Sequence, residues 1–128
     1  MVGVFDTNIL VDLLRNQREA PRKILDYTEI YIPATVAGEL LFGAKLSSRP
    51  LESTDKVLLL LQKSTIIEAN LQVADAYASI RHHLKVKGTP IPENDIWIAA
   101  SAFTYDLPLI TRDNHFSQID FLKVEYWD

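Results

Sequence analysis

Short runs of apolar residues recur along the chain, separated by longer segments with the spacing of helices. These runs lack the strict alternation of apolar and polar residues that marks a strand with one face in water. They therefore predict strands buried on both faces, as in a parallel sheet covered by helices. The expected strands cover residues 2–5, 29–32, 65–68, 107–111 and 122–126.

The segments between the expected strands predict helices, because apolar residues recur in them at intervals of three and four. Candidate caps indicate several helix ends. Ser53 or Thr54 is expected to begin one helix, and Asn70 is expected to begin a long helix that Gly88 ends. The expected helices cover residues 9–15, 21–27, 34–46, 55–63, 71–86 and 94–105.

The order of these elements predicts an α/β fold. We expect a three-layer sandwich in which a mainly parallel central sheet of about five strands is flanked by helices. No repeat, low-complexity tract or linker interrupts the pattern, so residues 1–128 are expected to form a single domain. Ligands of such folds bind beyond the carboxyl ends of the strands, which directs the search for functional residues to that edge.

The composition is that of an ordinary globular protein and narrows the possible chemistry. The 128 residues are 48% hydrophobic and 23% charged. The chain has no cysteine, which excludes disulfides, a catalytic thiolate and cysteine-bound zinc. The formal net charge of −4 argues against tight non-specific binding of nucleic acid. It does not exclude an enzyme whose carboxylates bind the cations that meet a phosphate.

The N-terminal residues do not resemble a secretory signal, because Asp6 interrupts any apolar segment and no basic segment precedes it. The longest apolar stretches, residues 57–61 and 96–100, are far shorter than the roughly 20 residues that span a membrane. We therefore expect a cytoplasmic protein with no membrane partner.

Four acidic residues occupy similar positions relative to the expected sheet. Asp6 directly follows the first strand, and Glu39 lies on the helix after the second strand. Asp113 lies two residues beyond the fourth strand, and Asp95 opens the helix that leads into that strand. Each acid taken singly has an ordinary structural explanation, such as a helix cap, a turn or a solvated side chain.

Glu39 and Asp95 are the hardest of the four to explain in that way. Apolar residues surround Glu39 in the sequence, and an apolar run follows Asp95 immediately. A carboxylate in such a setting requires water in a cleft or a cation. Converging carboxylates repel one another, and divalent Mg²⁺ or Mn²⁺ is the expected compensation. Sites of this kind are suited to cleaving phosphodiester bonds.

Four segments that contain these acids resemble the PIN domain, and within it the VapC-type toxins of toxin–antitoxin pairs. The segments are "VFDTNILVDLL", "IPATVAGELLFGA", "PENDIWIAASA" and "PLITRDNHF". Each segment alone is a weak indication, but the four occur in order and together extend over essentially the whole chain. The resemblance implies a metal-dependent endoribonuclease that uses Mg²⁺ or Mn²⁺.

The resemblance also implies roles for particular residues. Asp6, Glu39, Asp95 and Asp113 would form the catalytic quartet. Within it, Asp6 and Asp95 match the principal metal-binding positions, while Glu39 and Asp113 match supporting or second-metal positions.

Polar residues beside the quartet match positions that bind its carboxylates or the substrate. These residues are Thr7, Asn8 and Thr111. Arg112 is expected at the rim of the cleft, where it would pair either with a substrate phosphate or with the acids.

The resemblance implies three kinds of partner. One is a cognate antitoxin that occludes the acidic cleft, and another is an RNA substrate, for which transfer or ribosomal RNA is the first candidate. The third is a second copy of the chain in a homodimer. Residues 57–61 are apolar enough for an interface, but the sequence leaves open whether they belong to the core instead.

The histidines give weaker indications. His82 and His83 are adjacent on a helix and point about 100° apart, so they are poorly placed to chelate one ion and are expected on a solvated face. A minority alternative is contact with RNA phosphates as part of a small basic cluster. His115 is a possible general base, although a metal-bound water needs none. Trp97 is expected in the core.

Two other functions remain as alternatives. A phospho-accepting receiver-like domain also places acids at strand ends. It needs a second acid beside the first and a lysine after its last strand. Beside Asp6 this chain has Thr7 and Asn8 instead of an acid, which argues against a receiver. A PIN fold that only binds RNA or protein is the other alternative, and four intact acids argue against it.

Overall fold

The computed structural model describes residues 1–128 and contains one five-stranded sheet in the order β3-β2-β1-β4-β5. All four pairs of neighbouring strands are parallel. This arrangement confirms the expected α/β class and the five expected strands. The strands are β1 (Val2–Phe5), β2 (Glu29–Pro33), β3 (Thr65–Ile67), β4 (Leu109–Thr111) and β5 (Val124–Tyr126).

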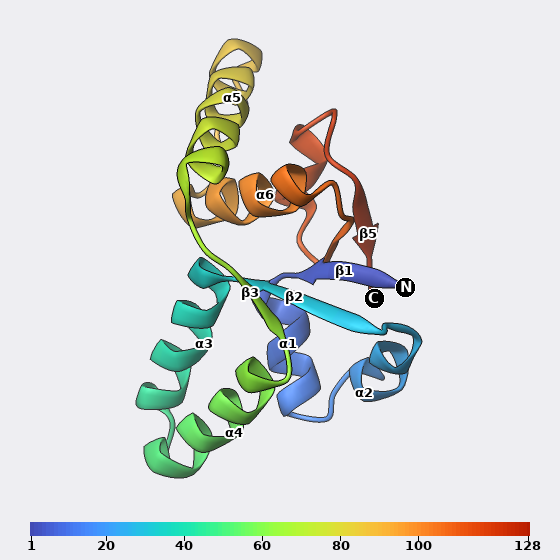
Figure 1. Ribbon diagram of the computed structural model, residues 1–128, viewed down its shortest axis with the longest axis vertical. Coiled ribbons are helices and arrows are strands. Elements are labelled where there is room, and N and C mark those ends of the chain that lie inside the picture. The colour runs from blue at the N-terminus through green and yellow to red at the C-terminus, as the bar shows by residue number, and fades with distance from the viewer.

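Helices cover both faces of the sheet and form the two outer layers of the sandwich. Figure 1 shows α1 to α4 on one side of the sheet and α5 and α6 on the other. The helices are α1 (Thr7–Leu14), α2 (Ala20–Lys23), α3 (Ala34–Leu46), α4 (Pro50–Gln62), α5 (Leu71–Lys87) and α6 (Glu93–Tyr105), with short 3-10 helices η1 (Ile24–Asp26) and η2 (Asn114–Gln118). None of these helices is both long enough and apolar enough to cross a membrane.

The central strand β1 determines where the site lies. Val4 and Phe5 are fully buried, as expected for a strand covered on both faces. Phe5 pairs with Ile110 of β4, and Val4 pairs with Tyr31 of β2. Because the three strands are parallel, their carboxyl ends lie along one edge of the sheet. Asp6, which follows β1, therefore lies beside the start of α3 and beside the residues that follow β4.

The ends of α5 match the expectation from sequence. The Asn70 side chain accepts a hydrogen bond from the Val73 backbone N–H at 3.0 Å and caps the helix. Gly88 ends it in the left-handed conformation, with φ of 77°, which a glycine adopts without a steric cost.

Two helices begin at least two residues earlier than expected. The expected caps Ser53 and Thr54 are wrong, because α4 begins at Pro50, whose fixed φ suits the first helical position. Ser53 lies inside the helix and accepts a hydrogen bond from the Ser47 hydroxyl at 2.8 Å. Helix α1 begins at Thr7 rather than residue 9, because Asp6 itself serves as the N-cap.

The first residues of the last two expected strands lie outside those strands. Strand β4 begins at Leu109, because the Leu107 N–H is used by the Ala102 carbonyl to close the end of α6. Strand β5 begins at Val124 rather than residue 122.

The apolar stretch at residues 57–61 lies on α4 and is partly core and partly surface. Val57 is buried at 4% exposure, whereas Leu58 and Leu59 are 42% and 56% exposed.

Candidate active site

Asp6 is the anchor of the site and is almost completely buried, at 4% exposure. Its Oδ1 accepts the Thr7 backbone N–H at 2.8 Å. Its Oδ2 accepts the Thr111 hydroxyl at 2.7 Å and the Asn8 side-chain amide at 3.2 Å. A carboxylate has about four acceptor positions, so these three bonds fix its orientation and leave about one position for a ligand. The predicted neighbours Thr7, Asn8 and Thr111 therefore contact the acid that they were expected to contact.

The environment of Asp6 disfavours its charged form. Burial raises the pKa of Asp6 from 3.8 to about 6, although hydrogen bonds from Thr111 and Thr7 act in the opposite direction. The negative charges of Asp95 and Glu39 raise this pKa further, because both lie close enough to repel Asp6. Acids that lie far apart in sequence therefore lie close together, and the site that Asp6, Glu39, Asp95 and Asp113 form is called the acidic cleft.

Glu39 reaches the cleft from the helix that follows β2. It is half-buried, and its Oε1 accepts the Thr7 hydroxyl at 2.6 Å. Thr7 thus holds two acids at once, because its backbone N–H binds Asp6 and its side chain binds Glu39. The first turn of α1 sets the position of Glu39 relative to β1.

Asp95, Asp113 and His115 form the tightest group in the site. The His115 Nδ1 lies 3.0 Å from Asp95 Oδ2 and 3.1 Å from Asp113 Oδ1. One ligand atom from each of the three residues lies within 4.8 Å of the others. Asp95 comes from the first turn of α6, whereas Asp113 and His115 follow β4. The sequence did not predict that His115 would join the acids so closely.

The pKa values within this group reflect burial and mutual charge. Burial raises the pKa of Asp95, the hydrogen bond from His115 lowers it, and the charges of Asp113 and Glu39 raise it again. The pKa of His115 is raised chiefly by its hydrogen bond to Asp95, and the Asp113 charge adds to this effect. Asp95 therefore interacts with the other acids as well as with the histidine.

Thr111 connects the two halves of the site. Its hydroxyl donates to Asp6 and accepts the Asp113 backbone N–H at 2.9 Å. Asp113 in turn accepts the His115 backbone N–H at 2.9 Å. The last residue of β4 is thus bonded both to the acid after β1 and to the segment that carries Asp113. The four predicted acids gather at this edge, and their individual roles stay predictions.

Arg112 pairs with an acid that the sequence analysis missed. Its Nε lies 2.9 Å from Asp12 Oδ2, and its Nη2 lies 3.3 Å from Asp12 Oδ1. Asp12 is 3% exposed and lies on α1, one and a half turns beyond Asp6. The charged residue within the apolar run "ILVDLL" was the available indication. Arg112 is therefore engaged within the protein, with its backbone N–H bound to Asn8 at 3.2 Å.

The remaining candidates lie outside the acidic cleft. His82 is exposed, and His83 packs against Phe121 and lies 3.6 Å from Asp120. Trp97, expected in the core, is partly buried and packs against the core, where it stacks on Tyr77 with ring centroids 4.1 Å apart. Trp97 therefore serves the packing of α6 against α5.

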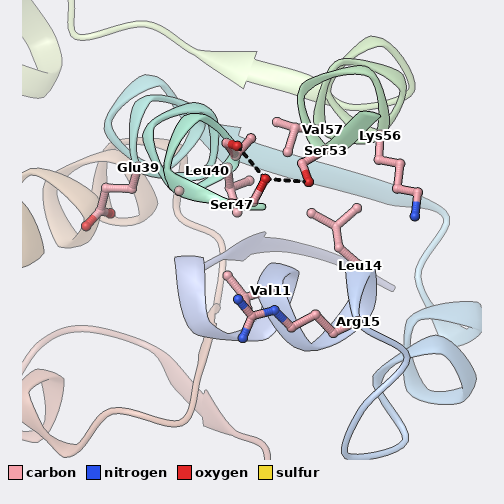
Figure 2. Close-up of a pocket in the computed structure, with 11 residues that line it drawn as sticks. Val11, Leu14, Arg15, Glu39, Leu40, Ser47, Ser53, Lys56 and Val57 are labelled. Atoms are coloured by element: carbon pink, nitrogen blue, oxygen red, sulfur yellow. Dashed lines mark hydrogen bonds between the residues drawn. The ribbon is translucent and has the colours of Figure 1, made fainter. Parts of the chain in front are cut away.

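A groove adjoins the acidic cleft. It has a volume of about 260 Å³ and lies between α1, α3 and α4. Figure 2 shows Val11, Leu14 and Arg15 facing residues of α3 and α4 across it, with Glu39 at one end. Its walls mix apolar residues such as Val57 with polar and charged residues such as Ser53 and Lys56. The other three acids do not line it, so the groove and the cleft share Glu39 as a boundary.

The donor atoms of the cleft suit a divalent cation. Carboxylate oxygens are the preferred ligands of Mg²⁺ and Mn²⁺, and a histidine nitrogen is compatible with Mn²⁺. Asp6 is buried and its pKa is raised, so its charged form is disfavoured. A nearby cation would stabilise that charged form. Asp95, Asp113 and His115 could hold one ion, with Asp6 and Glu39 beside it.

Comparisons with known proteins identify the family. A model of the PIN domain matches residues 3–122, and the chain therefore belongs to the PIN domain family. It is 29% identical over 132 residues to Ribonuclease VapC1 of Haemophilus influenzae (strain R2866), which covers 99% of this chain and 98% of the relative. It is 28% identical to Ribonuclease VapC2 of Rickettsia felis, with coverage of 100% and 99%.

Solved structures agree with this assignment. The chain is similar to the crystal structure of VapBC2 from Rickettsia felis bound to a DNA fragment from their promoter, with a TM-score of 0.90, 26% identity and full coverage of both chains. It is also similar to VapBC-1 from nontypeable Haemophilus influenzae, with a TM-score of 0.87, 27% identity and coverage of 99% and 98%. The family and the fold that the four sequence segments predicted are thereby confirmed.

Proposed function

We propose that this protein is a metal-dependent endoribonuclease and the toxin component of a toxin–antitoxin pair. The observation that carries the proposal is the convergence of Asp6, Glu39, Asp95 and Asp113 at one edge of the sheet. Relatives named as ribonucleases match the chain over almost their full length, which supports the same activity here.

Some residues of the cleft would bind the metal ion, and others would orient the water that attacks the phosphate. A bound Mg²⁺ or Mn²⁺ would acidify the attacking water and stabilise charge on the phosphate oxygens. Asp95 and Asp113 would hold the ion, and Asp6, fixed by three hydrogen bonds, would complete the site. Glu39, oriented by the Thr7 hydroxyl, is placed to accept a hydrogen bond from water at the mouth of the cleft.

The structure disfavours a phospho-accepting alternative. An acid that receives a phosphoryl group must be open to its donor, whereas Asp6 is 4% exposed and accepts three hydrogen bonds. The residue that would be its acidic neighbour in a receiver is Thr7, which instead binds Glu39. The same cleft is therefore better suited to metal-dependent hydrolysis.

The groove between α1, α3 and α4 is our proposed docking site for the antitoxin. Similar solved structures are toxin–antitoxin complexes. A segment with apolar side chains would match the apolar part of the groove lining, and acidic side chains on it would meet Arg15 and Lys56. Because Glu39 lies at the end of the groove, an occupant would also cover the mouth of the acidic cleft.

Two further features of the proposal concern assembly and substrate. A homodimer stays a prediction, for which the exposed Leu58 and Leu59 on α4 offer one apolar surface. Transfer RNA or ribosomal RNA stays the predicted substrate, as the resemblance to the VapC-type toxins implies.

The direct test is cleavage of RNA by the purified chain. Transfer RNA should be cut in the presence of Mg²⁺ or Mn²⁺, and EDTA should stop the reaction until an excess of metal is restored. Cleavage that persists in EDTA would contradict a metal-dependent mechanism. Absence of cleavage for both transfer and ribosomal RNA, with either metal bound, would contradict the proposed substrate class.

A further inference from the structure

We propose that His115 is a direct ligand of the bound metal ion and that it gives this site a preference for Mn²⁺ over Mg²⁺. This inference rests on the proposed function, because it concerns the ion that the acidic cleft would hold. It extends the predicted ligand set, which contains only carboxylates, by one nitrogen atom.

The spacing of the ligand atoms supports direct coordination. Neighbouring ligands of an octahedral ion with bonds of about 2.1 Å are separated by about 3.0 Å, since the edge of an octahedron is the bond length multiplied by √2. The His115 Nδ1 lies 3.0 Å from Asp95 Oδ2 and 3.1 Å from Asp113 Oδ1. The His115 nitrogen thus has the separation of an adjacent octahedral ligand from each carboxylate, and one ligand atom from each of the three residues lies within 4.8 Å of the others, close enough for one ion.

The orientation of His115 is also defined by its surroundings. Its backbone N–H binds Asp113 Oδ1 at 2.9 Å, which fixes the turn between the two residues. The next residue, Phe116, is completely buried and anchors η2 in the core. The imidazole therefore faces the acids from a secured segment rather than from a free surface loop.

The chemistry of imidazole determines which ion benefits. Mg²⁺ is a hard ion that prefers oxygen ligands and keeps several water molecules. Imidazole nitrogen suits transition metals best. Mn²⁺ shares the preference of Mg²⁺ for carboxylate oxygen, but as a transition metal it accepts an imidazole nitrogen more readily than Mg²⁺ does. A nitrogen among the ligands should therefore strengthen the binding of Mn²⁺ more than that of Mg²⁺.

The same distances also describe an ion pair between a protonated imidazole and two carboxylates. Electron spin-echo spectroscopy of the Mn²⁺-loaded chain separates the two possibilities, because only a coordinated nitrogen gives a strong hyperfine coupling. We expect this coupling in the parent protein, and isotope-labelled histidine should change it. His115→Gln should abolish it. His82→Gln is the matched control, because His82 is exposed on α5 away from the acids, and the coupling should persist there.

Calorimetric titration with each metal alone tests the preference. His115→Gln should weaken Mn²⁺ binding by about 10-fold or more, the usual scale for groups that support a metal site, and Mg²⁺ binding by less than about 3-fold. His82→Gln should change neither affinity. His115 is half-exposed, with 50% of its side chain accessible, so its replacement should leave the fold intact.

The outcomes distinguish this inference from the function on which it rests. If the parent binds Mn²⁺ without nitrogen coupling, or if His115→Gln weakens both ions equally, His115 is not a selective ligand and the inference is wrong. If the parent binds neither Mn²⁺ nor Mg²⁺, the proposed metal-dependent function fails together with it.

Discussion

The carboxylate of Asp12 and the guanidinium of Arg112 form a two-point ion pair that joins α1 to the segment after β4. The two residues are 100 positions apart in sequence, and their two N–O contacts measure 2.9 Å and 3.3 Å. Arg112 immediately precedes Asp113, so this pair and the bonds of Thr111 secure the backbone that carries one of the four acids. Asp12 therefore supports the site without contacting it.

Breaking this pair should destabilise the protein and loosen the site. Arg112→Met leaves the buried Asp12 carboxylate without its main partner, which should cost about 2–3 kcal/mol, somewhat less than a fully buried pair because 29% of the Arg112 side chain is exposed. Urea unfolding measures the loss, and titration with Mn²⁺ measures the effect on the cleft. Replacing both residues, Asp12→Leu with Arg112→Met, should cost less than the sum of the single changes.

An exposed ion pair provides the control for that experiment. Arg22 and Glu19 lie 2.6 Å apart with most of each side chain in water. Arg22→Met should leave both unfolding and metal binding unchanged, because exposed pairs contribute little. Equal effects of Arg22→Met and Arg112→Met would contradict a special role for Asp12.

Asp6→Asn should remove a pH-dependent loss of stability from the metal-free protein. The pKa of Asp6 is about 6 in the folded chain, compared with 3.8 for an unperturbed aspartate as in the unfolded chain. The folded chain therefore binds this proton more tightly than the unfolded chain does. The resulting stabilisation is complete below about pH 4 and is lost as the pH rises through about 6, a loss of about 2–3 kcal/mol. Asparagine does not titrate and escapes this loss.

Urea unfolding in EDTA at several pH values checks this expectation. The stability of Asp6→Asn relative to the parent should rise between about pH 4 and pH 7. If the difference in stability between Asp6→Asn and the parent did not vary with pH, Asp6 would not have the raised pKa. Asp75→Asn, at an exposed position on α5, should show no such trend.

Thr7→Val should slow catalysis more than it affects folding. The change removes the hydroxyl that binds Glu39 at 2.6 Å but keeps the backbone N–H that binds Asp6. We expect a decrease in kcat of about 10-fold, which is less than the roughly 10²- to 10⁴-fold that a proton-transferring group itself supplies because the Glu39 carboxylate remains, with a loss of stability of about 1 kcal/mol. Thr7→Ser retains the hydroxyl and should recover most of the rate. Equal rates for the valine and serine variants would rule out this role for the hydroxyl.

Gly43→Arg should block the antitoxin without disturbing the toxin. Gly43 lines the groove on α3, and a side chain there would meet no atom within 4 Å of its Cβ, so the backbone accepts the change. An arginine should fill the groove and weaken binding of the proposed antitoxin by at least about 10-fold, the effect of losing one central contact. Gly38→Arg is the control, because its Cβ also has open space but Gly38 does not line the groove. Similar weakening by both variants would contradict docking in the groove.

The positions of the strands along the chain and the gathering of the acids at one edge were predictable because both depend on local patterns. Buried strands appear as apolar runs, and parallel strands bring their carboxyl ends to one edge, so Asp6, Glu39 and Asp113 were expected at the same edge. The order of the strands in the sheet, which makes these residues neighbours, was not predicted. Their roles as ligands still rest on the family and on chemistry rather than on this geometry.

The features that sequence could not provide depend on packing between distant segments. The partner of Arg112 was missed because α1 and the end of β4 meet only in the folded chain. The close approach of His115 to Asp95 depends on how η2 packs beside α6. The start of α4 was placed wrongly because a strong preference of serine and threonine for caps outweighed the proline at the true first position.

The most direct test of the central claim is the rate of RNA cleavage by Asp95→Asn with saturating Mn²⁺, beside Asp75→Asn as a charge-matched control. The variant should lose at least about 100-fold in rate and fold as the parent does, because one carboxylate of the metal site is gone, while the control should cut at the parent rate. Cleavage by Asp95→Asn at the parent rate would contradict a catalytic site built on these carboxylates.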